Sequence, residues 1–105
     1  MALVHEFGII DDLTELGYEQ LKPQCIVVDD DNILPIITSF SIMRTYTHAL
    51  HHEGLGLNYY GITIIPPSSL ATFLDIIMPV KQLSELSAMI IEAQRKQQYM
   101  IHFGV

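Results

Sequence analysis

The prolines fix where the strands and helices of this chain can begin and end. Proline has no N–H group to donate to a strand ladder, and inside a helix its ring clashes with the carbonyl group four residues earlier. Pro66 and Pro67 therefore end the apolar, β-branched segment 57–65. Ser68 follows them and can accept hydrogen bonds from the free N–H groups at the start of a helix. The pair of prolines thus predicts a strand followed at once by a helix.

Pro35 closes the stretch CIVVDDDNILP, which joins a short apolar segment to three consecutive aspartates. Because proline fits only in the first turn of a helix, this helix must begin near Asp31 or Asn32, and either residue can cap it. Asp29 and Asp30 then fall in the strand-to-helix turn. Each is stabilised there by about 0.3–1 kcal/mol at the positive end of the helix dipole. The stretch predicts a buried strand, a carboxylate turn and a helix.

Changes in hydrophobic periodicity predict the remaining elements. Apolar residues that alternate or run continuously indicate strands, and apolar residues spaced i, i+3, i+4, i+7 indicate one face of a helix. The expected strands are 2–10, 24–29, 44–50, 57–65 and 98–103. The expected helices run from about 31 to 43, from 68 to a limit at Pro79, and from about 82 to 97, with loops at 11–23 and 51–56.

From residue 24 onward this order is β-α-β-β-α-β, which is the ferredoxin-like arrangement. Right-handed crossovers then place the helices on one face of a four-stranded antiparallel sheet. The N-terminal strand adds a fifth strand at an edge, beside either 98–103 or 44–50. We therefore expect a single α+β domain over residues 1–105.

Composition narrows the possible partners. Half of the residues are hydrophobic and 16% are charged, so a folded core is expected. Twelve Asp and Glu residues against five Lys and Arg residues give a net charge of −7. This balance argues against nucleic acid and anionic membranes, which are bound through basic surfaces. The chain shows no leader pattern at its start and no apolar run of about 20 residues, and Cys25 is expected to be a buried free thiol. A cytoplasmic location is expected.

A short motif recurs near the two ends of the chain, HEFG from His5 and HFG from His102. If the N-terminal strand pairs beside 98–103, His5 approaches His102. If it pairs at the other edge, His5 approaches His48. Two neighbouring imidazoles can bind a metal or share a proton near neutral pH. The favoured interpretation is structural, with half-buried sheet histidines hydrogen-bonded to their neighbours.

A second group of histidines lies in the segment HALHHE. His48, His51 and His52 precede Glu53, but the segment has the pattern of a strand end and loop rather than of a helix. Three histidines in a loop can hold a metal weakly without a biological role. The histidines of this loop are therefore not favoured as a metal site.

Asp29 and Asp30 are candidate ligands for a hard cation such as Mg²⁺ or Ca²⁺. The helix dipole accounts for only one or two of the three charges, and Asp31 is assigned to the cap. Consecutive aspartates do not match the alternate positions of a calcium loop, so a structural role is favoured. No cofactor is predicted, although a divalent metal is left open. The candidate polar site comprises His5, Glu6, Asp29, Asp30, His48 and His102.

The blocks HEFGI, VVDDD, GITIIPPSS, LSEL and a terminal IHFGV follow one another along nearly the whole chain. In these blocks the chain resembles a group of short bacterial proteins that have no established activity, substrate or catalytic residue. The resemblance implies a stand-alone, single-domain bacterial protein of the cytoplasm. It transfers no function.

Two functions follow as hypotheses. The first is a small acidic module that binds a partner protein or associates with itself, as a homodimer through a sheet edge or a sheet face. Its basis is the high apolar fraction, the negative charge and the lack of a catalytic motif. The alternative is a small metal- or ligand-dependent enzyme that uses the candidate polar site. That alternative requires several of these side chains to converge in one concave pocket.

Overall fold

The computed structural model describes residues 3–10, 24–47 and 52–105. The expected loop at 11–23 and the histidines His48 and His51 lie outside these ranges. The strands are β1 (Val4–Ile10), β2 (Ile26–Asp29), β3 (Arg44–Thr47), β4 (Glu53–Leu55), β5 (Ile62–Ile65) and β6 (Tyr99–Phe103). The α-helices are α1 (Asp30–Ile33), α2 (Leu70–Ile77) and α3 (Ser84–Lys96), with 3₁₀ helices at Leu34–Ile42, Pro67–Ser69 and Lys81–Leu83.

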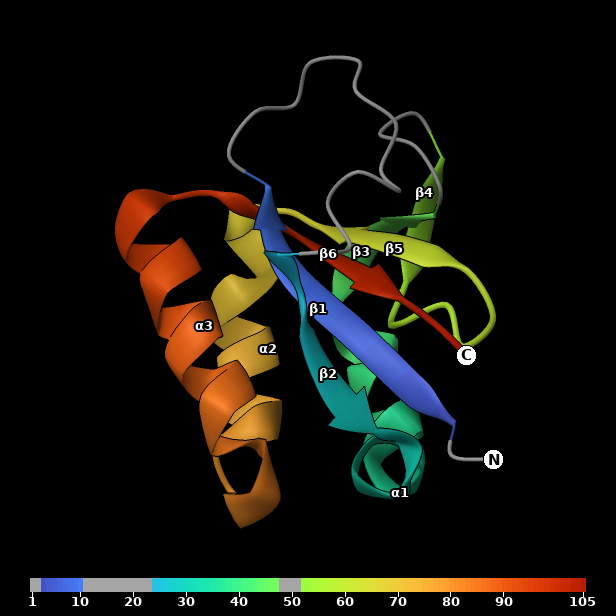
Figure 1. Ribbon diagram of the computed structural model, residues 1–105. Helices are drawn as coiled ribbons and strands as arrows, with labels where there is room; N and C mark the ends of the chain where they lie inside the picture. Colours follow the sequence, from blue (N-terminus) through green and yellow to red (C-terminus); the bar gives the residue numbers. More distant parts are fainter. Residues whose placement is uncertain (1–2, 11–23, 48–51) are drawn as a thin grey trace.

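The strands form one antiparallel sheet in the order β2-β1-β6-β5-β3-β4 (Figure 1). The α+β class is confirmed. The ferredoxin-like order is not, because that order places 98–103 at an edge, whereas β6 lies inside the sheet between β1 and β5. The segment 24–29 forms the edge instead, as β2. The sixth strand is β4, which was expected to be loop and which pairs with β3.

The N-terminal strand does not lie at an edge, because it pairs on both sides. It is antiparallel to β2 on one side and to β6 on the other. Phe7 and Ile10 are both buried, although strand alternation places them on opposite faces of the sheet. A strand that buries residues on both faces is stabilised most when it lies inside the sheet.

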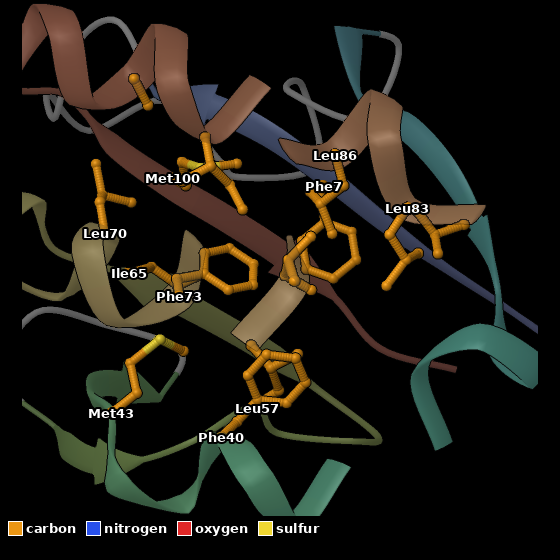
Figure 2. Close-up of a cluster of buried hydrophobic side chains, with 14 of the residues drawn as sticks. Phe7, Phe40, Met43, Leu57, Ile65, Leu70, Phe73, Leu83, Leu86 and Met100 are labelled. Atoms are coloured by element: carbon orange, nitrogen blue, oxygen red, sulfur yellow. The ribbon is translucent and has the colours of Figure 1, made fainter. Parts of the chain in front are cut away.

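The helices cover one face of the sheet, and the main core fills the space between the two layers (Figure 1). Phe7 from β1 packs against Phe73 from α2, and Phe73 packs against Phe40, with ring centroids 5.9 and 5.7 Å apart (Figure 2). A smaller apolar cluster buries Ile101 and Phe103 on the opposite face, where the half-buried Cys25 packs against it. Both faces of the central strands are therefore buried.

The aspartate turn differs from its expected form by two residues. The helix begins at Asp30, and the cap is Asp29. Its backbone is extended, and its side-chain Oδ1 accepts the N–H of Asp31 at 2.9 Å. Asp31 is therefore not the cap. After one turn of α-helix the chain tightens into the 3₁₀ helix Leu34–Ile42, which carries Pro35 in its first turn. The expected helix to Met43 is present as a helical segment, but mostly in 3₁₀ form.

Ser68 does not cap α2. The prolines open a short 3₁₀ turn, α2 starts at Leu70, and no side chain caps it. Ser69 instead donates its hydroxyl to the carbonyl oxygen of Arg44 at 2.5 Å, which ties the start of α2 to β3. Within the described ranges, no helix is long and apolar enough to cross a membrane.

Candidate functional site

The histidines of the recurring motif meet in the interior of the protein. His5 Nδ1 lies 2.8 Å from His102 Nε2, and His5 Nε2 lies 2.8 Å from Asp30 Oδ1. Tyr59 donates its hydroxyl to Asp30 Oδ2 at 2.8 Å. At the other end, His102 Nδ1 lies 3.4 Å from Thr63 Oγ1. We call these five residues the histidine–aspartate network.

Each member of the network comes from a different element. His5 belongs to β1, His102 to β6 and Thr63 to β5, which are neighbouring strands. Thr63 lies directly opposite His102 in the β5–β6 register. Asp30 is the first residue of α1, and its N–H donates to the carbonyl oxygen of Leu3 at 3.0 Å. The network therefore joins the start of β1, the start of α1 and the middle of the sheet.

Burial and hydrogen bonding set the charges in the network. His5 and His102 have no solvent exposure. Burial, and then the charge of His5, lower the pKa of His102 to about 3, so this imidazole is neutral at physiological pH. The hydrogen bond from His5, reinforced by the one from Tyr59, holds the pKa of Asp30 below its usual value, although burial opposes this shift. The bond to Asp30, together with burial, raises the pKa of Tyr59 to about 12.

One pattern of protons satisfies the network with both rings neutral. A carboxylate only accepts, so His5 Nε2–H donates to Asp30 and His5 Nδ1 must accept from His102 Nε2–H. His102 Nδ1 is then left to accept from the Thr63 hydroxyl, whose oxygen accepts the N–H of Asn58 at 2.7 Å. An added proton would make His5 a cation and shift His102 to its other tautomer. The geometry can thus relay a proton along the two imidazoles.

The network reaches solvent at one end only. The Asp30 side chain is 10% exposed, and Tyr59 is half-buried. Three exposed apolar residues are linked to these two residues, two of them through backbone hydrogen bonds and one through a ring contact. Leu3 accepts the Asp30 N–H, the backbone N–H of Leu34 donates to the Asp30 carbonyl oxygen, and the ring of Tyr60 contacts that of Tyr59. We call Leu3, Leu34 and Tyr60 the apolar rim.

The ring geometry does not fit a metal held between the two histidines. Two nitrogens bound at about 2.0–2.1 Å to one tetrahedral zinc ion are about 3.3 Å apart. The facing nitrogens of His5 and His102 are 2.8 Å apart, which is a hydrogen-bond distance. Both nitrogens of His5 are engaged in this way. Among the residues that the structure describes, no group of three His, Cys, Asp or Glu side chains is arranged to hold a metal ion.

The structure brings together three of the six candidate residues, His5, Asp30 and His102. Glu6 follows His5 in β1, so strand alternation directs it to the other face of the sheet. Asp29 is exposed and serves as the cap of α1. Asp29 therefore does not belong to the network that contains Asp30. His48 lies outside the described residues.

Sequence reasoning missed Tyr59 and Thr63. Thr63 is the polar residue within the apolar strand β5, and a buried hydroxyl in such a strand requires a partner. Tyr59 carried no comparable signal, because it was expected to lie within a strand at 57–65. The blocks HEFGI, VVDDD, GITIIPPSS and IHFGV each supply one member of the network, so segments that are far apart in the sequence meet here.

Comparison with known proteins adds no further assignment. No protein-family model, curated protein or solved structure matches the chain.

Proposed function

We propose that this chain is a small protein-binding module, which binds a partner protein or a second copy of itself through the apolar rim. The observation that carries the proposal is the exposure of the rim side chains, at 51% for Leu3, 53% for Leu34 and 80% for Tyr60. Large apolar groups that stand together on a surface mark interaction sites, and tyrosine is frequent among the residues that dominate binding energy.

The histidine–aspartate network supports this role because it fixes the elements that carry the rim. Asp30 anchors the start of α1, next to Leu34, and its bond from Tyr59 anchors the segment that carries Tyr60. A surface held rigid before binding loses less conformational entropy when it binds. We place the module in the cytoplasm, in keeping with a sequence whose one cysteine cannot form an internal disulfide.

A partner-capture experiment tests the proposal. The tagged protein is used to capture partners from its native host, and a variant with Leu34→Ser and Tyr60→Ala is compared with the wild type by quantitative mass spectrometry. Sedimentation over a range of about 1 µM to 1 mM measures self-association of both proteins. We expect one enriched partner, or a dimer, that the double variant loses.

The matched control carries Met78→Ser and Ile91→Ala, which change two other exposed apolar side chains, 58% and 47% exposed, in the helical layer. This variant should retain the partner or the dimer. If the wild type is monomeric throughout and captures nothing that depends on the rim, the proposal fails.

The convergence of His5, Asp30 and His102 favours a second candidate, acid–base catalysis at the exposed end of the network. A substrate would then contact Asp30 and Tyr59, the members that reach solvent. The variant Asp30→Asn removes the carboxylate, keeps a side-chain oxygen that can accept the Tyr59 hydroxyl, and changes no rim side chain. An enzyme predicts that host cells carrying it accumulate a specific metabolite, whereas a binding module predicts unchanged metabolite profiles and retained partner capture.

A further inference from the structure

A cavity of about 370 Å³ lies on the face of the sheet that the helices leave uncovered. Strand alternation places Arg44 and Tyr46 of β3, together with Glu53 and Leu55 of β4, on this face. Thr45 and Gly54 of the same two strands, with Pro66 and Ser68 after β5, complete the lining. None of the members of the histidine–aspartate network lines the cavity.

The cavity presents one cation and one anion that do not neutralise each other. Arg44 lies opposite Leu55, and Tyr46 lies opposite Glu53, so Arg44 and Glu53 are diagonal neighbours with backbones about 7–8 Å apart. Both are exposed, and within the described part of the chain Arg44 forms no ion pair. A guanidinium with free N–H groups binds a carboxylate in a bidentate manner, and the Ser68 hydroxyl can add a further donor.

Besides these polar groups and Thr45, the lining contains apolar side chains. Leu55 is 67% exposed beside the cavity, and the ring of Tyr46 and the ring of Pro66 supply two further apolar surfaces. The volume is near the lower end of the roughly 300–1,000 Å³ found for small-molecule pockets. This size suits a molecule with about ten non-hydrogen atoms rather than a peptide segment.

We infer that this cavity binds a small zwitterion of the amino-acid class with an apolar side chain. The ligand carboxylate pairs with Arg44, its ammonium group pairs with Glu53, and its side chain packs against Leu55 and Tyr46. The guanidinium of Arg44 and the carboxylate of Glu53 do not pair with each other, so each can pair with the oppositely charged group of one zwitterion. This site is separate from the apolar rim, so the inference stands or falls independently of the proposed protein-binding function.

Titration of the isotope-labelled protein with L-leucine, followed by NMR, tests the inference. We expect saturable shifts of the backbone amides of Arg44, Tyr46, Leu55 and Ser68. Leucinamide lacks the carboxylate, 4-methylpentanoate lacks the ammonium group, and glycine lacks the side chain. Each should bind at least about tenfold more weakly, as expected from the loss of one charge-assisted contact or of the apolar contact.

Two variants locate the binding. Arg44→Gln and Glu53→Gln should each weaken leucine binding by at least about tenfold. Lys81→Gln, which removes an exposed cation outside the lining, should leave it unchanged. A protein whose spectrum keeps its dispersion is folded, so lost binding in either variant then reports on the site. The inference is overturned if leucine gives no saturable shift, if the shifts map elsewhere, or if an analogue binds as tightly as leucine.

Discussion

His102 is a fully buried titratable ring, and its protonation opposes folding. Its pKa is about 3 in the folded state, against about 6.5 in an unfolded chain. Between these values the unfolded state binds more protons, so stability falls as the pH is lowered through this window. Asp30 adds to the loss at the acid end, because its lowered pKa stabilises the folded state only while the carboxylate is ionised.

We therefore expect the urea midpoint of the wild type to decline steadily between about pH 6.5 and pH 4. His102→Gln should be less stable at neutral pH, but its decline should be shallower because the buried imidazole is gone. His52→Gln, which changes an exposed histidine, serves as the control and should follow the wild type. Equal slopes for His102→Gln and the wild type would show that His102 does not cause the decline.

Tyr59 gives a second pH signature, at the alkaline end. Its pKa is raised to about 12, from an ordinary value of 10. The folded state therefore keeps this proton while the unfolded state loses it, and stability falls as the pH rises from about 10 to 12. Ultraviolet titration should show a late tyrosine ionisation, and Tyr59→Phe should remove that step. Loss of an early step instead would contradict the hydrogen bond to Asp30.

Not every residue of the network could be predicted from the sequence. The paired HEFG and HFG motifs suggested that His5 and His102 meet, because residues on adjacent strands are neighbours. The cap, however, depends on which aspartate has an extended backbone, and three identical side chains in a row do not distinguish between Asp29 and Asp31. Tyr59 reaches Asp30 through a loop conformation that no periodicity reveals.

At the scale of elements, the C-terminal turn of α3 depends on a strained residue. Gln97 has a φ of 53°, and the N–H of Gln98 donates to the carbonyl oxygen of Ala93 at 2.9 Å. This is a Schellman motif, in which glycine is preferred at the left-handed position because it has no Cβ. Gln97→Gly should therefore stabilise the protein by about 0.5–1 kcal/mol.

Thermal unfolding measures this effect, with an expected rise of a few degrees, since about 1 kcal/mol shifts the midpoint of a domain of this size by roughly 4–8 °C. Gln94→Gly is a matched control, because Gln94 is an exposed residue inside the same helix. The control should lower the midpoint. If both variants lower it, the left-handed position of Gln97 is not a source of strain.

The C-terminal segment packs so closely against the segment before β5 that position 104 has no room for a side chain. Gly104 donates its N–H to the carbonyl oxygen of Gly61, and a Cβ at Gly104 would overlap the backbone carbonyl of Tyr59. Gly104→Ala should cost about 1–3 kcal/mol in a urea titration, because backbone cannot move aside as a side chain does. Gly54→Ala should cost less, since its new Cβ would meet side-chain hydroxyls, that of Thr47 closely and that of Thr45 at van der Waals distance, and no backbone atom.

The type of most elements followed from apolar periodicity, and their bounds did not. The helix after the aspartates was expected from its apolar spacing, but Pro35 and the burial of Phe40 favour the tighter 3₁₀ form. The segment at 53–55 was expected as loop because it is short and contains Gly54. Its pairing with β3 is a tertiary contact that local sequence does not encode.

For the whole molecule, strand order was the least predictable property. The sequence of elements permitted the N-terminal strand to pair at either edge of a ferredoxin-like sheet, and local patterns gave no reason to insert it between 24–29 and 98–103. The inserted position buries both faces of β1 and makes β6 a central strand. The alternation of apolar residues within a strand indicates which of its faces is buried. The order of the strands depends instead on which arrangement of the whole sheet buries all of these apolar faces together.

Hydrogen exchange distinguishes the observed order from the ferredoxin-like one. A central strand has every amide bonded to one neighbour or the other, whereas an edge strand leaves alternate amides free. Since β6 pairs with both β1 and β5, its amides from Tyr99 to Phe103 should all exchange slowly, close to the rate of global unfolding.

In the edge strand β4, the amide of Gly54 points toward β3, while Glu53 and Leu55 direct their amides outward and should exchange faster. The alternation in β4 is the internal control, because it shows that the measurement resolves an edge. An alternating pattern in β6 would place that strand at an edge and would contradict the meeting of His5 with His102 from adjacent strands.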